Sequence, residues 1–504
     1  MLEALSVAFH ELFSIKIILM IIAGLFGGLM TGALPGLTAT MAVALLVPFT
    51  FAMSPTDGLI LLGAIYMACI YGGSFSAILV NTPGTPSSIG TTFDGYPMAL
   101  RGEGERAILV ATYASVYGGI IGVIFLFFLS PPLASVALQF GPPEYFWMAV
   151  FGITIISSLA SKNIVKGFIG GGIGLLISTI GIAPIGGEVR FTADFPQLQG
   201  GVELIVALIG FFCIPEAMTM IGQRTKQFHL AEAKRQPRIF LGTLQEVMKR
   251  QGNLLRSSII GTIVGILPGA GGSVANLVAY NEAIRASKTP EKFGTGYIDG
   301  IIATESSNNA VVGGGIIPLV TLGIPGAPPD AVLYGVLLLH GLRPGPELFT
   351  THSQIIYTFI LSLFMATILM LPVGVICGRA LHRTVVRLPI RYLAPLIIFL
   401  TVIGSYSIRN NITDVFIMLV LGVLGYILKR LGFHPGPITL GLILGPIGEM
   451  GFVQALLMGT TLPNKWMIFF DRPLSWVLII MSAVSLCWPL IAKRLAKGWK
   501  IKEM

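Results

Sequence analysis

The chain has 504 residues, of which 54% are hydrophobic and only 11% charged, and its mean hydropathy is +0.84. Soluble domains carry about 25% charged residues, so this composition excludes an ordinary soluble protein and predicts an all-α polytopic membrane protein. The net charge of +9 could indicate a nucleic-acid partner, but the basic residues lie in short segments between apolar runs. We therefore expect a lipid membrane environment and no nucleic-acid partner.

Uncharged runs long enough to cross a bilayer follow one another along the chain. They occupy residues 17–56, 58–93, 107–143, 167–187, 306–329, 348–378 and 473–492. Further spans are expected near residues 145–161 and 204–221. Because about 20 apolar residues cross the hydrocarbon core as a helix, we expect about 10–12 transmembrane helices.

Two motifs occur twice, in the same order. The stretch GALPGLTATMA (32–42) resembles GILPGAGGSVA (265–275) at an offset of 233, and GGSFSAILVNTPGTP (72–86) resembles GGIIPLVTLGIPGAP (314–328) at an offset of 242. Chance similarity in a chain rich in Gly and Pro is the alternative, because both residues are common in membrane helices. Two ordered matches favour an internal repeat.

The basic segments predict the orientation of these repeats. Residues 222–256 hold eight Lys or Arg and two Glu, residues 379–391 hold four Arg, and residues 493–502 hold five Lys or Arg. Such an excess is typical of cytoplasmic loops, which places the C-terminus in the cytoplasm. Four spans follow the first repeat before residue 222 and one span, 353–378, follows the second. The repeats should therefore be inverted, as in many secondary transporters.

This reasoning divides the chain into four segments. We expect a first inverted repeat with its following spans (1–222), a basic cytoplasmic linker (223–256), a second inverted repeat with its following spans (257–472), and a last span with a basic cytoplasmic tail (473–504).

Each repeat should contain broken helices and a re-entrant hairpin. Proline lacks a backbone N–H and clashes with the preceding turn, so the prolines of NTPGTP and GIPGAPP interrupt any helix there. In a membrane such breaks persist only where protein or water covers them. Free N–H groups at half-helix N-termini attract anions, and free carbonyl groups suit small cations. We expect the hairpin tips to bind an anionic solute and a coupling ion.

The polar residues at and near these breaks are the candidate ligands. For the substrate they are Asn81, Thr82, Gly84, Thr85, Ser87, Ser88, Asn308, Asn309, Gly323, Gly326 and Asp330. For the coupling ion they are Thr38, Thr40, Ser273, Asn276 and Glu305. Three alternatives stay open: interhelical hydrogen bonding by the Asn308–Asn309 pair, a membrane-edge loop carboxylate for Glu305, and N-capping by the residues after the Leu-Pro-Gly breaks.

Signatures of catalysis or metal binding are missing from the sequence. The glycine-rich stretch 265–274 lacks the lysine of a phosphate-binding loop, and HExxH is absent. The four cysteines form no CxxC pair. We expect no enzyme activity, no catalytic or metal site and no cofactor.

Several of these motifs resemble one family. GALPGLTATMAVALL, YGGSFSAILVNTPGTPSS, FDGYPMA, GILPGAGG, NNAVVGGGIIPLVTLGIPG and HGLRPGPELF are similar to the large membrane subunit of tripartite tricarboxylate transporters. The resemblance implies a multi-pass secondary transporter of the bacterial inner membrane that takes up citrate-like carboxylates by symport with Na⁺ or H⁺. It also implies a periplasmic solute-binding protein and a small membrane subunit as partners. The site role extends by resemblance to residues 81–88 and 323–330.

A second function remains open. A stand-alone carboxylate channel or an exporter would use the same hairpins as a static filter. The predicted inversion of the repeats favours alternating access.

Overall fold

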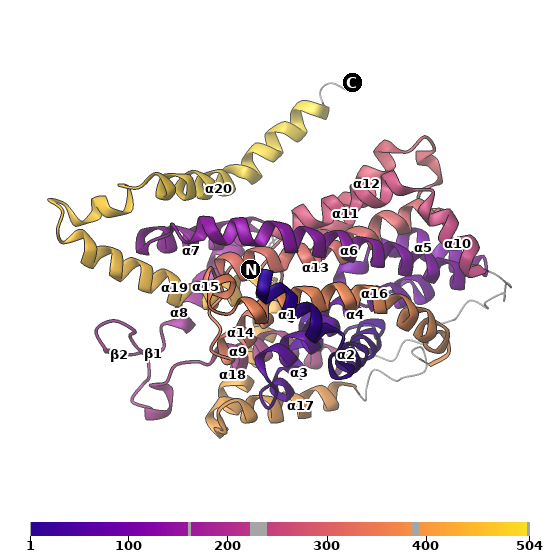
Figure 1. The fold of residues 1–504 in the computed structure, drawn as a ribbon. Helices are drawn as coiled ribbons and strands as arrows, with labels where there is room; N and C mark the ends of the chain where they lie inside the picture. The colour runs from indigo at the N-terminus through magenta and orange to yellow at the C-terminus, as the bar shows by residue number, and fades with distance from the viewer. Residues whose placement is uncertain (1, 160–162, 222–238, 385–392, 501–504) are drawn as a thin grey trace. The chain divides into compact units, whose positions relative to one another are not determined.

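The computed structural model describes residues 2–159, 163–221, 239–384 and 393–500 (Figure 1). Seven helices in this part are long and apolar enough to cross a membrane: α2, α4, α6, α9, the first part of α16, α18 and α19. Six shorter apolar helices or helix portions accompany them. The chain is therefore an all-α, multi-pass membrane protein, as predicted.

The chain forms two compact units that alternate along the sequence, residues 1–134 with 212–411 and residues 135–211 with 412–504. Two of the three boundaries fall within α6 and α9, and the third falls between α17 and α18. In the first unit the helices are α1 (Leu2–Leu12), α2 (Ile15–Ala33), α3 (Ala39–Thr50), α4 (Pro55–Val80), η1 (Pro86–Ser88), α5 (Thr91–Leu100), α6 (Gly104–Ala137), α10 (Ile239–Met248), α11 (Gln251–Ile266), α12 (Gly271–Ala286), η3 (Pro290–Lys292), α13 (Ile298–Leu322), α14 (Pro328–Leu339), α15 (Glu347–Thr350), α16 (Ser353–Thr384) and α17 (Leu393–Arg409).

The second unit holds the remaining elements. They are α7 (Pro142–Leu159), α8 (Ile164–Ser178), β1 (Gly181–Ile182), β2 (Val189–Arg190), η2 (Pro196–Leu198), α9 (Leu204–Ile221, which continues into the first unit), α18 (Ile412–Arg430), α19 (Pro435–Gly459), η6 (Lys465–Phe469) and α20 (Pro473–Lys500). β1 and β2 pair antiparallel. Helices α8 and α19 approach closely, because a Cβ at Gly174 or Gly441 would overlap a backbone carbonyl oxygen of the other helix, a use of small residues common in membrane helices.

The two repeated motifs pack in the same way inside the first unit. A Cβ at Gly32 on α2 would overlap the carbonyl oxygen of Cys69 on α4, and a Cβ at Gly265 on α11 would lie 2.7 Å from the carbonyl oxygen of Val311 on α13. These pairs correspond at the offsets of 233 and 242. Two further contacts correspond in the same way. Gly28 lies against Ile65 as Gly261 lies against Ser307, and Gly72 lies against Leu29 as Gly314 lies against Thr262. The repeats therefore share the close packing of helix backbones as well as sequence, while their inversion stays a prediction.

Each repeat is interrupted at its motifs, as expected from the prolines and glycines. Gly36 after α2 and Gly269 after α11 have φ values of +96° and +81°, which only glycine adopts readily. Asn81 after α4 and Gly323 after α13 are also left-handed, with φ values of 52° and 71°. We call residues 81–90 the first tip and residues 323–330 the second tip.

Some segments differ from the sequence-based expectation. The predicted span 167–187 contains α8, which already ends at Ser178, and glycines with positive φ at 181, 186 and 187 turn the chain into the small hairpin. Residues 239–248 and 251–256 of the predicted linker are helical. Residues 222–238 and 385–391 of the basic segments, and the last basic residue at 502, lie outside the described residues.

Candidate functional site

The second Leu-Pro-Gly break joins the two tips. The backbone N–H of Gly269 donates to the carbonyl oxygen of Gly326 in the second tip at 2.8 Å. A Cβ at Gly272, in the first turn of α12, would lie 2.6 Å from Cβ of Ser87 in the first tip and 3.0 Å from Oδ1 of Asn308. Residues of the first and second repeats therefore meet where α12 begins.

The first tip presents buried hydroxyl groups. Thr85, Ser87 and Ser88 are buried, and the hydroxyls of Thr85 and Ser87 are 3.0 Å apart. The Ser88 hydroxyl lies within hydrogen-bonding distance of the carbonyl oxygens of Gly73 and Thr85, at 3.0 and 2.9 Å. Ser88 thus closes the turn, whereas Thr85 and Ser87 supply donors at its buried face.

The remaining first-tip residues have local roles. Asn81 is exposed and ends α4 in the left-handed conformation, with its N–H donating to the Ser76 carbonyl. The Thr82 hydroxyl donates to the carbonyl of Val80 at 3.3 Å. Gly84 allows close approach, because a Cβ there would overlap the carbonyl oxygen of Gly32.

The second tip carries a buried carboxylate. Asp330 is fully buried in the first turn of α14, and its Oδ2 accepts the N–H of Ala327 at 2.7 Å. Its Oδ1 has no hydrogen-bond partner. The phenol of Tyr66 on α4 lies beside the carboxylate, and a Cβ at Gly315 on α13 would overlap Oδ2.

The two neighbouring asparagines face different surroundings. Asn308 faces Gly272, as Ser87 of the first tip does, and its Nδ2 donates to the carbonyl of Ile70 on α4 at 3.4 Å. Asn309 turns toward α16, where its Nδ2 lies 3.7 Å from Sδ of Met370. Both Oδ1 atoms are buried without a partner. Only Asn308 therefore lies at a tip.

Glu305 and Asn276 link helices of both repeats. The Glu305 oxygens accept hydrogen bonds from the hydroxyls of Thr91 on α5 and Ser115 on α6, the latter at 3.0 Å. Asn276 on α12 accepts from the N–H of Gly90 at 2.9 Å and donates to the carbonyl of Thr304 at 3.3 Å. Both side chains are fully buried, so Glu305 is not at a loop edge.

Of the other predicted ion ligands, Thr38 and Thr40 lie at the start of α3, while Ser273 lies at the start of α12, where the tips meet. Thr38 caps α3 by accepting the N–H of Met41 at 3.2 Å, which is the capping role considered above. Thr40 is buried in the first turn of α3, and Ser273 is half-buried in the first turn of α12. The hydrogen bonds described for Glu305 come from Thr91 and Ser115 rather than from these three residues.

Sequence reasoning missed Asp94, which fixes the loop before α13. Its Oδ1 accepts the backbone N–H groups of Gly294, Gly296 and Tyr297 at 2.7–2.9 Å, and its Oδ2 accepts the Tyr280 hydroxyl at 2.8 Å. A signal was present, because an acidic residue directly after a long uncharged run is a functional or structural candidate. Tyr66 carried no such signal.

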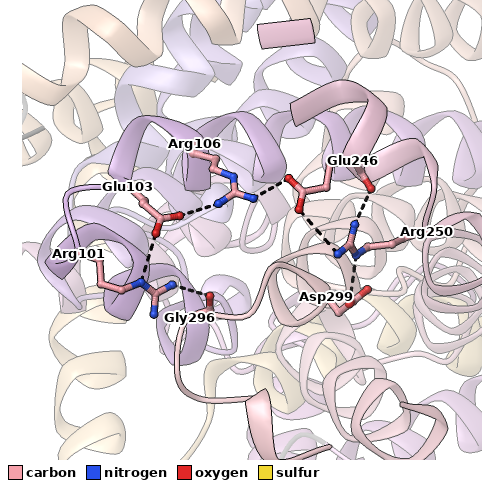
Figure 2. Close-up of polar contacts among 7 residues, drawn as sticks. All are labelled: Arg101, Glu103, Arg106, Glu246, Arg250, Gly296 and Asp299. Atoms are coloured by element: carbon pink, nitrogen blue, oxygen red, sulfur yellow. Dashed lines mark hydrogen bonds and ion pairs between the residues drawn. The ribbon is translucent and has the colours of Figure 1, made fainter. Parts of the chain in front are cut away.

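A network of ion pairs lies next to this loop (Figure 2). Arg106 pairs with Glu103 at 2.7 Å and with Glu246 at 2.6 Å, and Arg250 pairs with Asp299 at 3.2 Å. Arg101 donates to the carbonyls of Thr295 and Gly296. The network joins the segment after the first tip to α10 and to the start of α13. Its side chains are partly exposed, so each pair contributes only about 0–1 kcal/mol.

The buried centre presents several kinds of group that can bind a ligand. It offers hydroxyl, amide and backbone groups together with two carboxylates. In the part of the chain that the structure describes, no group of three His, Cys, Asp or Glu side chains could hold a metal ion.

A multi-pass membrane protein whose buried polar centre lies between interrupted helices has the architecture of membrane transport proteins. The family follows from the sequence: residues 18–440 match the model of the tripartite tricarboxylate transporter TctA family, and the chain belongs to this family. The resemblance inferred from the motifs is thereby confirmed.

Two proteins of Agrobacterium vitis are similar to this chain. One, described as an uncharacterized 52.8 kDa protein in the TAR-I ttuC' 3' region, is 34% identical over 493 residues, which cover 98% of this chain and 96% of that protein. The other, described as an uncharacterized protein in the TAR-II ttuC' 3' region, is 34% identical over 232 residues, or 46% of this chain and 94% of that protein. No solved structure matches the chain.

Proposed function

We propose that this chain is the large subunit of a binding-protein-dependent tripartite transporter that takes up citrate-like carboxylates across the bacterial inner membrane, driven by an ion gradient. The observation that carries the proposal is the meeting of both tips at the start of α12, where Ser87 of the first tip lies against Gly272 and the carbonyl of Gly326 in the second tip accepts the N–H of Gly269. Membership of a tricarboxylate transporter family supports the substrate class.

The chemistry of the first tip favours an anion. Thr85 and Ser87 have hydroxyl donors, and the first turn of α12 has N–H groups that no residue within the helix can satisfy. These donors and the helix dipole stabilise a carboxylate. A co-transported Na⁺ or H⁺ offsets the cost of bringing that negative charge into a low-dielectric site. The inverted repeats then alternate access to the two sides.

The proposed assembly has two further protein partners. A periplasmic solute-binding protein delivers the carboxylate, and a small membrane subunit completes the transporter. The large subunit has no enzyme activity, uses no cofactor beyond the coupling ion, and has its C-terminus in the cytoplasm. The tripartite character of the family supports this arrangement.

Reconstitution tests the proposal. The chain is placed in proteoliposomes with both partner proteins, and uptake of radiolabelled citrate and related di- and tricarboxylates is measured under imposed Na⁺ or proton gradients. We expect accumulation that depends on the binding protein and on one gradient. Equilibration without accumulation, independent of any gradient, would instead support a stand-alone channel. Outward transport alone would support an exporter.

A further inference from the structure

The hydrogen bonding of Asp330 differs from that of three other buried carboxylates, those of Asp94, Glu144 and Glu305. Asp94 accepts four hydrogen bonds, and Glu144 pairs with Arg472 at 2.6 Å. Glu305 has a hydroxyl donor at each oxygen. Asp330 keeps one oxygen without a hydrogen bond, although the whole side chain is buried.

Among the residues that the structure describes, no cationic side chain forms an ion pair with Asp330. None of the ion pairs in the described residues involves it. Its Oδ2 accepts the N–H of Ala327 and would overlap a Cβ at Gly315, and the phenol of Tyr66 lies beside the carboxylate. An uncompensated charge in such surroundings is strongly unfavourable, so this site favours the binding of a proton or a small metal cation.

Residues at equivalent positions of the two repeats differ in chemistry at the two tips. At the offset of 242, Asp330 corresponds to Ser88, and Tyr66 corresponds to Asn308. Tyr66 of the first repeat lies beside the second tip, while Asn308 of the second repeat lies beside the first tip. Equivalent positions thus carry an acid and a phenol at one tip, and a hydroxyl and an amide at the other.

We infer that the tips divide the ligands: Asp330 and Tyr66 at the second tip bind the coupling cation, a proton or Na⁺, and the first tip binds the carboxylate. The inference rests on the proposed function and refines it. It moves Asp330 from the substrate to the cation, because a negatively charged aspartate would repel a carboxylate ligand. It also takes the ion-binding role from Glu305, whose two oxygens are already hydrogen-bonded.

The test measures cation binding by the purified full-length chain without any carboxylate. The variants are Asp330→Asn and Asp330→Ser, both of which keep an oxygen to accept the Ala327 N–H, so that one remains informative if the other does not fold. Glu305→Gln tests the competing assignment. Glu449→Gln is the control, because Glu449 is ion-paired to Arg190 at 2.6 Å.

Two measurements distinguish the two cations. Radioactive Na⁺ binding is measured at constant ionic strength, and proton uptake is measured by potentiometric titration without Na⁺. If Na⁺ is the ligand, we expect affinity at least about tenfold weaker in both Asp330 variants, a loss of about 1.4 kcal/mol. If the ligand is a proton, the wild type should take up about one proton more than either variant between about pH 9 and about pH 5. In the Na⁺ measurement, Glu305→Gln and Glu449→Gln should behave as wild type.

The inference is overturned if both Asp330 variants match the wild type in both measurements, or if Glu305→Gln alone loses cation binding. Because no carboxylate is added, this result is independent of the proposed substrate. A wild-type chain that binds the cation through Asp330 but transports no carboxylate would contradict the proposed function and leave the cation site intact.

Discussion

Asp94 and Asn308 lie in the same compact unit and are both fully buried, but their hydrogen bonding differs. The oxygens of Asp94 accept four hydrogen bonds from the polypeptide, so the residue holds a loop in place. Asn308 keeps Oδ1 without a partner beside the first tip. A buried polar atom without a partner is costly, and we interpret such atoms at the tips as sites prepared for a ligand.

Replacing Asp94 with alanine should strongly destabilise the fold. Three backbone N–H groups would lose their acceptor, and each unsatisfied group costs about 1–3 kcal/mol. Glu103→Ala is the matched control, since its partly exposed ion pairs contribute up to about 1 kcal/mol each. Thermal unfolding in detergent measures both variants. Equal stability of the two variants would contradict the structural role of Asp94.

Asn308→Leu should weaken carboxylate transport far more than Asn309→Leu. The first change removes a hydrogen-bonding group at the first tip, and a hydrogen bond to a charged group contributes about 1.5–3 kcal/mol, equivalent to at least about tenfold in affinity. Thr85→Leu should act like Asn308→Leu. The readout is the substrate dependence of uptake in proteoliposomes, with membrane assembly checked in parallel. Normal uptake by both tip variants would place the substrate elsewhere.

Among the elements, the pairs α2–α4 and α11–α13 show why glycine recurs in the repeated motifs. At Gly32 and Gly265 the backbones of the paired helices lie so close together that a Cβ on either glycine would meet a carbonyl oxygen of the other helix. In each pair a longer helix, α4 or α13, lies beside a shorter one, α2 or α11, that ends at a Leu-Pro-Gly break. Packing against α4 and α13 therefore holds α2 and α11 in place, although each of them stops at a break.

Gly32→Ala and Gly265→Ala should each lower stability. The added methyl group meets a backbone oxygen of the paired helix, and overpacking of this kind costs about 1–3 kcal/mol. Gly27→Ala on α2 is the control, because nothing lies within 4 Å of a Cβ there. Unfolding temperatures of the purified proteins provide the measurement. A Gly27 variant as unstable as the other two would argue against helix packing as the cause.

For the whole molecule, the side of the membrane on which each repeat opens decides the transport mechanism. The related packing of the two repeats is present in the structure, but inverted and parallel repeats would share it. The basic segments are the basis for the predicted inversion. Residues 235 and 385 in two of these segments lie outside the described residues.

Cysteines introduced at residues 235 and 385 should react with a membrane-impermeant reagent only from the cytoplasmic side. Arg343→Cys, in an exposed position after α14, should react only from the periplasmic side. The four native cysteines are first replaced so that each label is unique. Labelling of residues 235 and 343 from the same side would exclude the inverted arrangement.

Substrate and cation should strengthen each other's binding by the same factor. A cation at the second tip reduces the electrostatic cost of an anion at the first tip, and thermodynamic linkage makes the coupling reciprocal. Carboxylate affinity is measured at increasing Na⁺ and at decreasing pH, and cation affinity at increasing carboxylate. Accumulation that persists when both gradients are collapsed, with no other energy source, is incompatible with the mechanism.

The sequence by itself determined the membrane class, the positions of the breaks and the repeat. These depend on local properties: few charges, prolines that remove a hydrogen-bond donor, and glycines that permit positive φ. The family was also evident from the motifs. Of the residues predicted to bind substrate, Thr85, Ser87 and Asp330 lie buried at the two tips, and Asn308 faces Gly272 as Ser87 does.

Only the tertiary structure decided how the polar residues differ from one another. Asn308 and Asn309 are neighbours in sequence, but successive residues point in different directions around a helix, so Asn308 faces Gly272 and Asn309 faces Met370. The partners of Asp94 lie about 200 residues away, and Tyr66 meets Asp330 across a comparable distance in sequence. Whether a buried polar atom is paired depends on such distant contacts, which local sequence does not specify.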